Sequence, residues 1–326
     1  MKPLKNTTLT KLPVVCLIAS ICCFLWGSAF PSIKIGYQLF AIKSTDTASQ
    51  LLFAGIRFTL AGALVILFGS LLQKKPLLPQ KKSLPNICKL ALVQTVIQYL
   101  FFYIGLANTS GVKSSIIEAS NVFLSILAAS LIFRYEKFTG QKLLGCLLGF
   151  GGVILINTAG AGMDFHMTLT GEGFILISAL SYAFSSVLIK KYSADENPVT
   201  LSGYQFLAGG IFLALCGFFM GGHLSAFTPA SALLLLYMAL ISAVAYSLWG
   251  ILLKYNPVSR VSVFGFLNPV CGVILSAVLL NEKNQAFSAA GFLSLILVCL
   301  GIYVVNKQGK IVKKEAVPDE GKPSGN

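Results

Sequence analysis

Apolar residues come in ten long runs along the chain, separated by short polar segments. Each run is close to the 20 or so residues that a helix needs to cross the hydrocarbon core of a bilayer. The predicted helices are 13–38, 49–72, 87–107, 112–133, 140–157, 171–190, 198–220, 230–253, 258–280 and 285–305. The pattern therefore predicts an all-α membrane protein of ten transmembrane helices. The polar residues 307–326 at the C-terminal end are expected to form a disordered tail.

Lysine and arginine residues fall very unequally on the two sides of this arrangement. If the N-terminus is cytoplasmic, 20 of the 25 lie in cytoplasmic segments, three lie outside, and Lys34 and Arg57 lie within helices. An excess of positive charge marks cytoplasmic loops. The first apolar run is too long for a signal-peptide core and is interpreted as an uncleaved helix. We therefore expect a multi-pass protein of the cell (inner or plasma) membrane with both termini cytoplasmic.

The two halves of the chain resemble each other at an offset of 146 to 148 residues. Residues 55–58 match 203–206, Asn121 matches Asn268, and Glu136-Lys137 matches Glu282-Lys283. Each half holds five predicted helices, an odd number, so the second half enters the membrane in the opposite sense. The sequence therefore predicts two inverted five-helix repeats, 12–157 and 170–306. Such repeats are typical of secondary transporters, whose site lies near the bilayer midplane between the repeats.

The amino-acid composition limits the kinds of molecule that the protein can bind. The chain is 56% hydrophobic and 11% charged, with a mean hydropathy of +0.80, so lipid must surround it. The net charge is +14, and the lysines and arginines that carry it lie between the apolar runs and at the chain ends. This distribution argues against a nucleic-acid partner. No Cys-x-x-Cys pair occurs and the two histidines stand in separate loops, so we expect no metal site and no cofactor. A phosphate-binding loop and a catalytic set are also missing from the sequence, which disfavours an ATP-driven pump or an enzyme.

Three ionisable residues lie inside predicted helices, where a charge must face a cavity or a partner: Lys34, Arg57 and Glu118. Arg57 either binds a substrate carboxylate or phosphate, or forms a structural pair with Glu118 or caps free carbonyls. Glu118 either takes up a coupling proton or meets a substrate ammonium, or it pairs permanently with Arg57 or Lys34. Lys34 is expected to reach the interface with its long side chain. The second half offers only Gln205 and Gly265 at the nearest equivalent positions.

Uncharged residues complete the candidate site. Besides Arg57 and Glu118, the candidate substrate-binding residues are Trp26, Ser28, Tyr103, Asn121, Gln205, Tyr246 and Asn268. The alternative for each is ordinary helix packing or an interhelical hydrogen bond. Pro31 and Pro269 interrupt helical hydrogen bonding and are candidate hinges. The glycines of Gly145-x-x-x-Gly149 permit close helix packing, either within one chain or in a homodimer.

These residues resemble the EamA family of the drug/metabolite transporter superfamily. The resemblance is carried by Leu25-Trp26-Gly27-Ser28-Ala29-Phe30 with Lys34, by Arg57-Phe58, by Asn268-Pro269 and by Leu280-Asn281-Glu282-Lys283, and it extends over nearly the whole chain. It implies a ten-helix, two-repeat permease, often an exporter of amino acids or related metabolites. This chain departs from the pattern in its first half, which has Phe123 where the second has Pro269 and carries Glu118 in mid-helix.

Together these features predict a secondary transporter of a small metabolite, working by alternating access and driven by a proton gradient or by exchange. Export of an amino acid or a related compound is the leading hypothesis. An importer or a lipid-carrier flippase of the same fold is an alternative within transport. A membrane sensor or enzyme that transports nothing is the alternative from another class.

Overall fold

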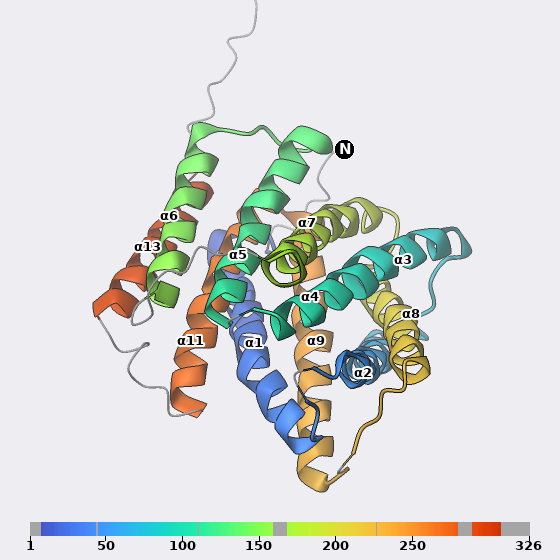
Figure 1. The fold of residues 1–326 in the computed structure, drawn as a ribbon. Coiled ribbons are helices and arrows are strands. Elements are labelled where there is room, and N and C mark those ends of the chain that lie inside the picture. Colours follow the sequence, from blue (N-terminus) through green and yellow to red (C-terminus); the bar gives the residue numbers. More distant parts are fainter. Residues whose placement is uncertain are drawn as a thin grey trace, which may run out of the picture.

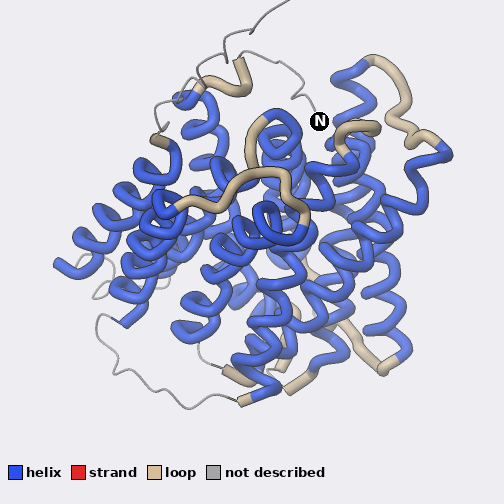
Figure 2. The backbone as a smooth tube through the Cα atoms, turned by 90° about the horizontal axis from the view of Figure 1, so that it is seen from above, coloured by secondary structure: helices blue, strands red, loops and turns tan. Residues whose placement is uncertain are grey.

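The protein is helical throughout the part of the chain that the structure describes. The computed structural model describes residues 8–43, 45–109, 111–158, 168–225, 227–279 and 289–307, and within these ranges it contains helices and no strand. Figure 2 shows that loops are short connections between the helices. The prediction of an all-α protein is confirmed for these residues. Glu282-Lys283 and nearly all of the predicted tail lie outside them.

Helical residues occur in all ten predicted segments. In chain order the helices are α1 (Leu12–Leu39), α2 (Thr47–Gln73), η1 (Lys81–Ser83), α3 (Leu84–Leu90), η2 (Ala91–Ile97), α4 (Gln98–Ala107), α5 (Gly111–Leu127), η3 (Ala128–Ile132), α6 (Gly140–Thr158), η4 (Leu169–Gly173), α7 (Phe174–Tyr192), α8 (Pro198–Phe219), α9 (Pro229–Tyr255), α10 (Val258–Ser262), η5 (Val263–Phe266), α11 (Leu267–Leu279) and α13 (Ala289–Asn306). Among them η2, η3 and η4 are π-helical, while η1 and η5 are 3₁₀-helical.

Length and apolarity identify a multi-pass membrane protein. Six helical segments suffice to cross a membrane: Leu12–Leu39, Thr47–Gln73, Lys81–Leu106, Leu169–Tyr192, Pro198–Phe219 and Pro229–Tyr255. Ile117–Ile132, Gly140–Leu155 and Phe292–Asn306 are shorter apolar stretches. Large apolar side chains such as Leu72 and Phe219 are 86% and 80% exposed, as lipid-facing residues are. That all ten segments cross the bilayer, as two inverted repeats, stays a prediction.

Two predicted helices differ from their expected form. The third begins at Lys81 rather than at residue 87, because Pro85 stands in the first turn of α3, where its missing N–H costs nothing. The ninth, expected as one regular helix, contains the 3₁₀ segment η5. Pro269 stands shortly after η5 and has no N–H to donate to the carbonyl of Gly265, so regular α-helical bonding is lost there.

Glycines hold α2 and α8 in unusually close contact. A Cβ added to Gly55 would lie 2.2 Å from the backbone N of Ala214, and one added to Gly62 would lie 2.4 Å from the N of Leu207. As the chain advances along α2 the contacts move backward along α8, so the two helices are antiparallel (Figure 1). Each helix repeats glycine every seven residues, at 55, 62 and 69 and at 203, 210 and 217. Equivalent surfaces of the two sequence halves therefore face each other.

A second glycine contact joins α6 to α13. A Cβ added to Gly145 would lie 2.8 Å from the backbone oxygen of Gly301. A Cβ added to Gly301 would lie 2.6 Å from the backbone oxygen of Gly145. Gly149 packs against the ring of Phe266. The Gly145-x-x-x-Gly149 pattern is thus used for packing within the chain (Figure 1).

Candidate functional site

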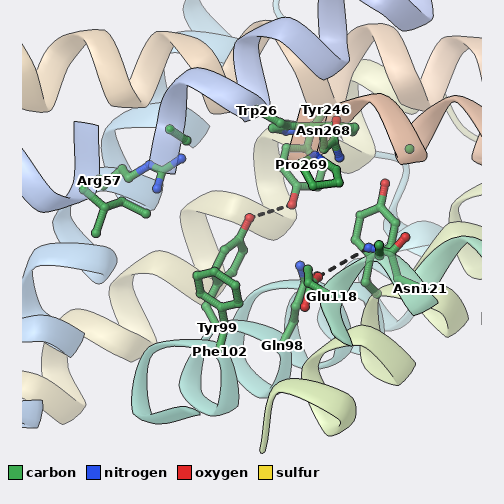
Figure 3. Close-up of a pocket in the computed structure, with 15 residues that line it drawn as sticks. Trp26, Arg57, Gln98, Tyr99, Phe102, Glu118, Asn121, Tyr246, Asn268 and Pro269 are labelled. Atoms are coloured by element: carbon green, nitrogen blue, oxygen red, sulfur yellow. Dashed lines mark hydrogen bonds between the residues drawn. The ribbon is translucent and has the colours of Figure 1, made fainter. Parts of the chain in front are cut away.

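A small cavity lies among helices that come from both halves of the chain (Figure 3). It is lined by Trp26, Ala29 and Ile33 of α1, Arg57 of α2, Gln98, Tyr99 and Phe102 of α4, Glu118, Ala119 and Asn121 of α5, Tyr182 of α7, Tyr246 of α9, Gly265 of η5, and Asn268 and Pro269 of α11. Its volume is about 90 Å³. Small-molecule sites usually measure roughly 300–1,000 Å³. The cavity is therefore small in this structure compared with typical small-molecule sites.

Six of the nine candidate substrate-binding residues line this cavity: Trp26, Arg57, Glu118, Asn121, Tyr246 and Asn268. They come from five helices that are far apart in the sequence. Pro269, one of the two candidate hinges, is also in the wall. Their binding of a substrate stays a prediction, but they share one cavity.

The other three candidates lie outside the cavity wall. The hydroxyl of Ser28 donates to the carbonyl of Leu25 at 2.7 Å and bonds the hydroxyl of Tyr237 at 2.9 Å. Gln205 accepts a hydrogen bond of 2.6 Å from the hydroxyl of Thr95. Ser28 thus forms hydrogen bonds within α1 and between α1 and α9, and Gln205 forms one between α8 and η2.

Tyr103 and Pro31 are also buried outside the cavity wall. Tyr103 is 1% exposed, and its ring packs 5.9 Å from that of Phe102. Pro31 lies inside α1, which continues as helix on both sides of it. A hinge at Pro31 stays a prediction.

Arg57 is buried and anchored to a neighbouring helix. Its side chain is 2% exposed, its Nε donates to the carbonyl of Met238 at 3.3 Å, and its Nη2 donates to the hydroxyl of Ser242 at 3.0 Å. The guanidinium also lies 5.0 Å from the ring centre of Phe58. These contacts hold it to α9 by neutral groups. Among the described residues it forms no ion pair, so its charge faces the cavity without an anion.

Glu118 lies across the cavity from Arg57 (Figure 3). One carboxylate oxygen accepts a long hydrogen bond of 3.4 Å from Asn121, and the other is buried with no partner among the described side chains and backbone. Lys34 is exposed and does not line the cavity. The described coordinates thus contain no ion pair between Glu118 and either cation. A half-buried glutamate and a buried arginine instead share a cavity, each without a counter-charge.

Several wall residues were not predicted as candidates: Gln98, Tyr99, Phe102, Tyr182 and Gly265. Gln98 comes directly after the π-helical segment Ala91–Ile97. A π-helical turn inserts an extra residue and rotates the next turn of the helix, and such turns are frequent at functional sites. The available sequence signal was a glutamine in the middle of an apolar run.

Aromatic rings form much of the remaining wall. The ring of Trp26 lies 5.0 Å from that of Tyr246 and 6.3 Å from that of Tyr182, both edge to face. The hydroxyls of Tyr99 and Tyr246 share a hydrogen bond of 2.6 Å. Five aromatic side chains thus line the cavity together with five polar or charged ones.

Matching positions of the two halves meet here. Asn121 and Asn268 both line the cavity, and so do Glu118 and Gly265, which correspond at the same offset. A Cβ at Gly265 would lie 3.8 Å from the side-chain oxygen of Asn121. It would also lie 2.9 Å from the side chain of Val122, so the counterpart of the acid is a glycine packed closely against α5, and the acid is present on one side only.

Comparison with known proteins relates this arrangement to transporters. A model of the EamA-like transporter family matches residues 13–158 and again residues 169–307. The uncharacterized transporter YvbV of Bacillus subtilis is 26% identical, over 92% of this chain and 94% of that protein. A probable amino-acid metabolite efflux pump of Escherichia coli is also 26% identical, over 88% of this chain and 93% of that protein. One solved structure shares the fold with a TM-score of 0.74 and 18% identity, covering 90% of this chain and 96% of that one.

Proposed function

Because the chain belongs to the EamA-like transporter family, we propose that it is a secondary transporter that exports an amino acid or a related small metabolite by alternating access. The proposal includes ten transmembrane helices in two inverted repeats and both termini in the cytoplasm of a cell-membrane protein. The relatives named as probable amino-acid metabolite efflux pumps, in Escherichia coli and Salmonella typhimurium, support the direction and the substrate class.

One observation carries the proposal. Arg57 is buried and Glu118 is half-buried in the wall of one cavity, on opposite sides and without ion-pair partners among the described residues. Unpaired charges in a membrane are costly and mark substrate or ion pathways. A cation and an anion that face one cavity suit a ligand that itself bears opposite charges, as an amino acid does.

The small volume of the cavity suits a stage of the transport cycle in which the site is not wide open to either side. Alternating access would open it to one side as one bundle rocks against the other. The 3₁₀ segment η5 and Pro269 stand at the wall, where the regular hydrogen bonding of the helix is already interrupted. Glu118 is the carboxylate in the wall that a coupling proton would occupy when no substrate is bound. Exchange of one metabolite for another is the alternative source of energy.

Transport by the purified full-length protein in liposomes tests the proposal. Vesicles loaded with a panel of radiolabelled amino acids should lose at least one of them faster than protein-free vesicles. Efflux should increase when an inward proton gradient or an external unlabelled substrate is supplied. Arg57→Ala and Glu118→Gln should each reduce the flux strongly. Undiminished flux in both variants would refute the site, and no flux of any compound would favour a sensor.

A further inference from the structure

Buried polar atoms around the cavity lack partners, and most of them are acceptors. Among the described atoms, Gln98 Oε1, Glu118 Oε2 and Asn268 Oδ1 are buried without a hydrogen bond. The one unpaired donor of this kind in the wall is Trp26 Nε1. Buried polar atoms in native proteins are normally satisfied, so a set of unsatisfied acceptors around a cavity indicates what the cavity receives.

We infer that the substrate carries a primary ammonium group, and that Glu118, Gln98 and Asn268 form the subsite that receives it. This inference rests on the proposed function. An ammonium has three donors and no acceptor, so it satisfies a carboxylate oxygen and neutral side-chain oxygens together. Either amide can turn its oxygen toward the ligand without changing its shape.

The aromatic wall favours the same ligand. Trp26 packs edge to face against Tyr246 and Tyr182, and all three line the cavity beside the polar groups. Aromatic faces attract cations, and more strongly where water is excluded. Glu118 supplies the formal charge, while the rings reduce the cost of removing water from an ammonium.

Arg57 does not oppose this assignment. It lies across the cavity, and Met238 and Ser242 hold its guanidinium against α9. A substrate carboxylate can meet it there while the ammonium sits at Glu118. The ammonium is the group assigned here, because Arg57 already donates to two partners on α9, whereas Glu118 has only Asn121 as a partner, at 3.4 Å.

Binding to the purified full chain in lipid nanodiscs tests the inference by calorimetry, with a matched series of three probes. L-leucine carries both charges, isopentylamine lacks the carboxylate, and N-acetyl-L-leucine lacks the ammonium while the aliphatic body stays constant. We expect the first two to bind and the third not to bind. Glu118→Gln should weaken binding of both amines about tenfold or more, and Gln98→Leu should weaken it severalfold.

Controls separate recognition from folding. Gln94→Leu makes the same change one turn earlier, at a buried glutamine outside the cavity wall, and should leave binding unchanged. Glu118→Asp should restore part of the affinity that Glu118→Gln loses. Binding of N-acetyl-L-leucine as tight as that of L-leucine would overturn the inference, and so would no binding of either amine.

Different results would refute the transport function and the ammonium subsite. Amines that bind through Glu118 but are never moved across liposomes would refute transport and leave the subsite standing. Flux of other compounds, with no amine bound, would refute the subsite and leave transport standing.

Discussion

The carboxylate of Glu136 accepts the backbone N–H of Ser259 at 3.0 Å, although the two residues are 123 positions apart. The hydroxyl of Ser259 donates to the same carboxylate, and Lys142 Nζ pairs with it at 2.6 Å. Ser259 stands in the first turn of α10, whose leading N–H groups have no partner within the helix. One acid thus ties the loop after η3 to the start of α10, and joins the two halves matched by the family model.

Replacing Glu136 by alanine should lower the free energy of unfolding by about 2 kcal/mol. The change leaves the backbone N–H of Ser259 without its acceptor, while Lys142 keeps the carbonyl of Lys137, and hydrogen bonds to charged groups are worth about 1.5–3 kcal/mol. Lys142→Ala should cost clearly less, because the bonds to Ser259 remain. Unfolding of the purified variants in mixed micelles measures both. Equal losses in the two variants would show that the ion pair, rather than the link to α10, is what matters.

The α2–α8 contact should tolerate no side chain. Gly62→Ala places a Cβ 2.4 Å from the backbone of Leu207, which cannot give way as a flexible side chain can. We expect a loss of about 1–3 kcal/mol, the usual cost of overpacking. Gly151→Ala is the matched control, since nothing lies within 4 Å of a Cβ there. It should not lower stability, because alanine is also the better helix former. The same micelle unfolding assay compares them, and equal stability of the two variants would argue against close α2–α8 packing.

The positions of the helices can be predicted from the sequence because backbone groups in lipid can be satisfied only within a helix or a closed barrel. The apolar run at 198–220 therefore corresponds to α8, Pro198–Phe219, whose start is capped by Asn197. The early start at Lys81 escaped prediction because Lys81 and Lys82 make that turn polar. The π-helix at Ala91–Ile97 escaped as well, since an inserted residue leaves the average hydropathy unchanged.

The site was only partly predictable for a similar reason. Arg57 and Glu118 stand out because charges are rare inside apolar runs. A tyrosine or a phenylalanine does not stand out, because the chain contains 11 tyrosines and 24 phenylalanines. The sequence therefore could not separate Tyr99 and Tyr182 from residues that only pack the core. Gln205 looked like a cavity residue, but its side-chain oxygen accepts a hydrogen bond from the hydroxyl of Thr95, 110 positions away. Only the packing of η2 against α8 reveals that bond.

Ser242→Ala should impair recognition of a substrate carboxylate, although Ser242 does not line the cavity and acts only through Arg57. The hydroxyl of Ser242 holds Arg57 Nη2 at 3.0 Å, and its loss releases one end of the guanidinium. We expect affinity for L-leucine to fall about tenfold, while affinity for isopentylamine, which has no carboxylate, changes little. Ser178→Ala, at another buried serine that is not in the cavity wall, is the control. Equal weakening of the two ligands would mean that Arg57 shapes the cavity rather than binding the carboxylate.

Asp46 should make stability fall in acid. Its carboxylate accepts the backbone N–H of Ser49 at 3.0 Å and so caps α2. Hydrogen bonds from the side chain and backbone of Ser49 hold the pKa of this carboxyl below its usual value. Because the pKa is lower in the folded state, the contribution is complete above the ordinary aspartate pKa, near 4, and is lost as pH falls through the folded pKa.

Two variants of Asp46, compared with the wild type, separate the cap from the charge. Asp46→Ala should lower stability at pH 7 by about 1 kcal/mol, the usual value of an N-cap. Asp46→Asn keeps a good cap and should stay within a few tenths of the wild type at pH 7, since asparagine and aspartate cap almost equally well. Its stability should vary less with pH below about 4, because the amide does not titrate. Thermal unfolding of the three proteins from pH 7 to acid gives the comparison. If the asparagine variant lost stability in acid as steeply as the wild type, another carboxylate would have to be responsible, and the cap at Asp46 would be electrostatically neutral.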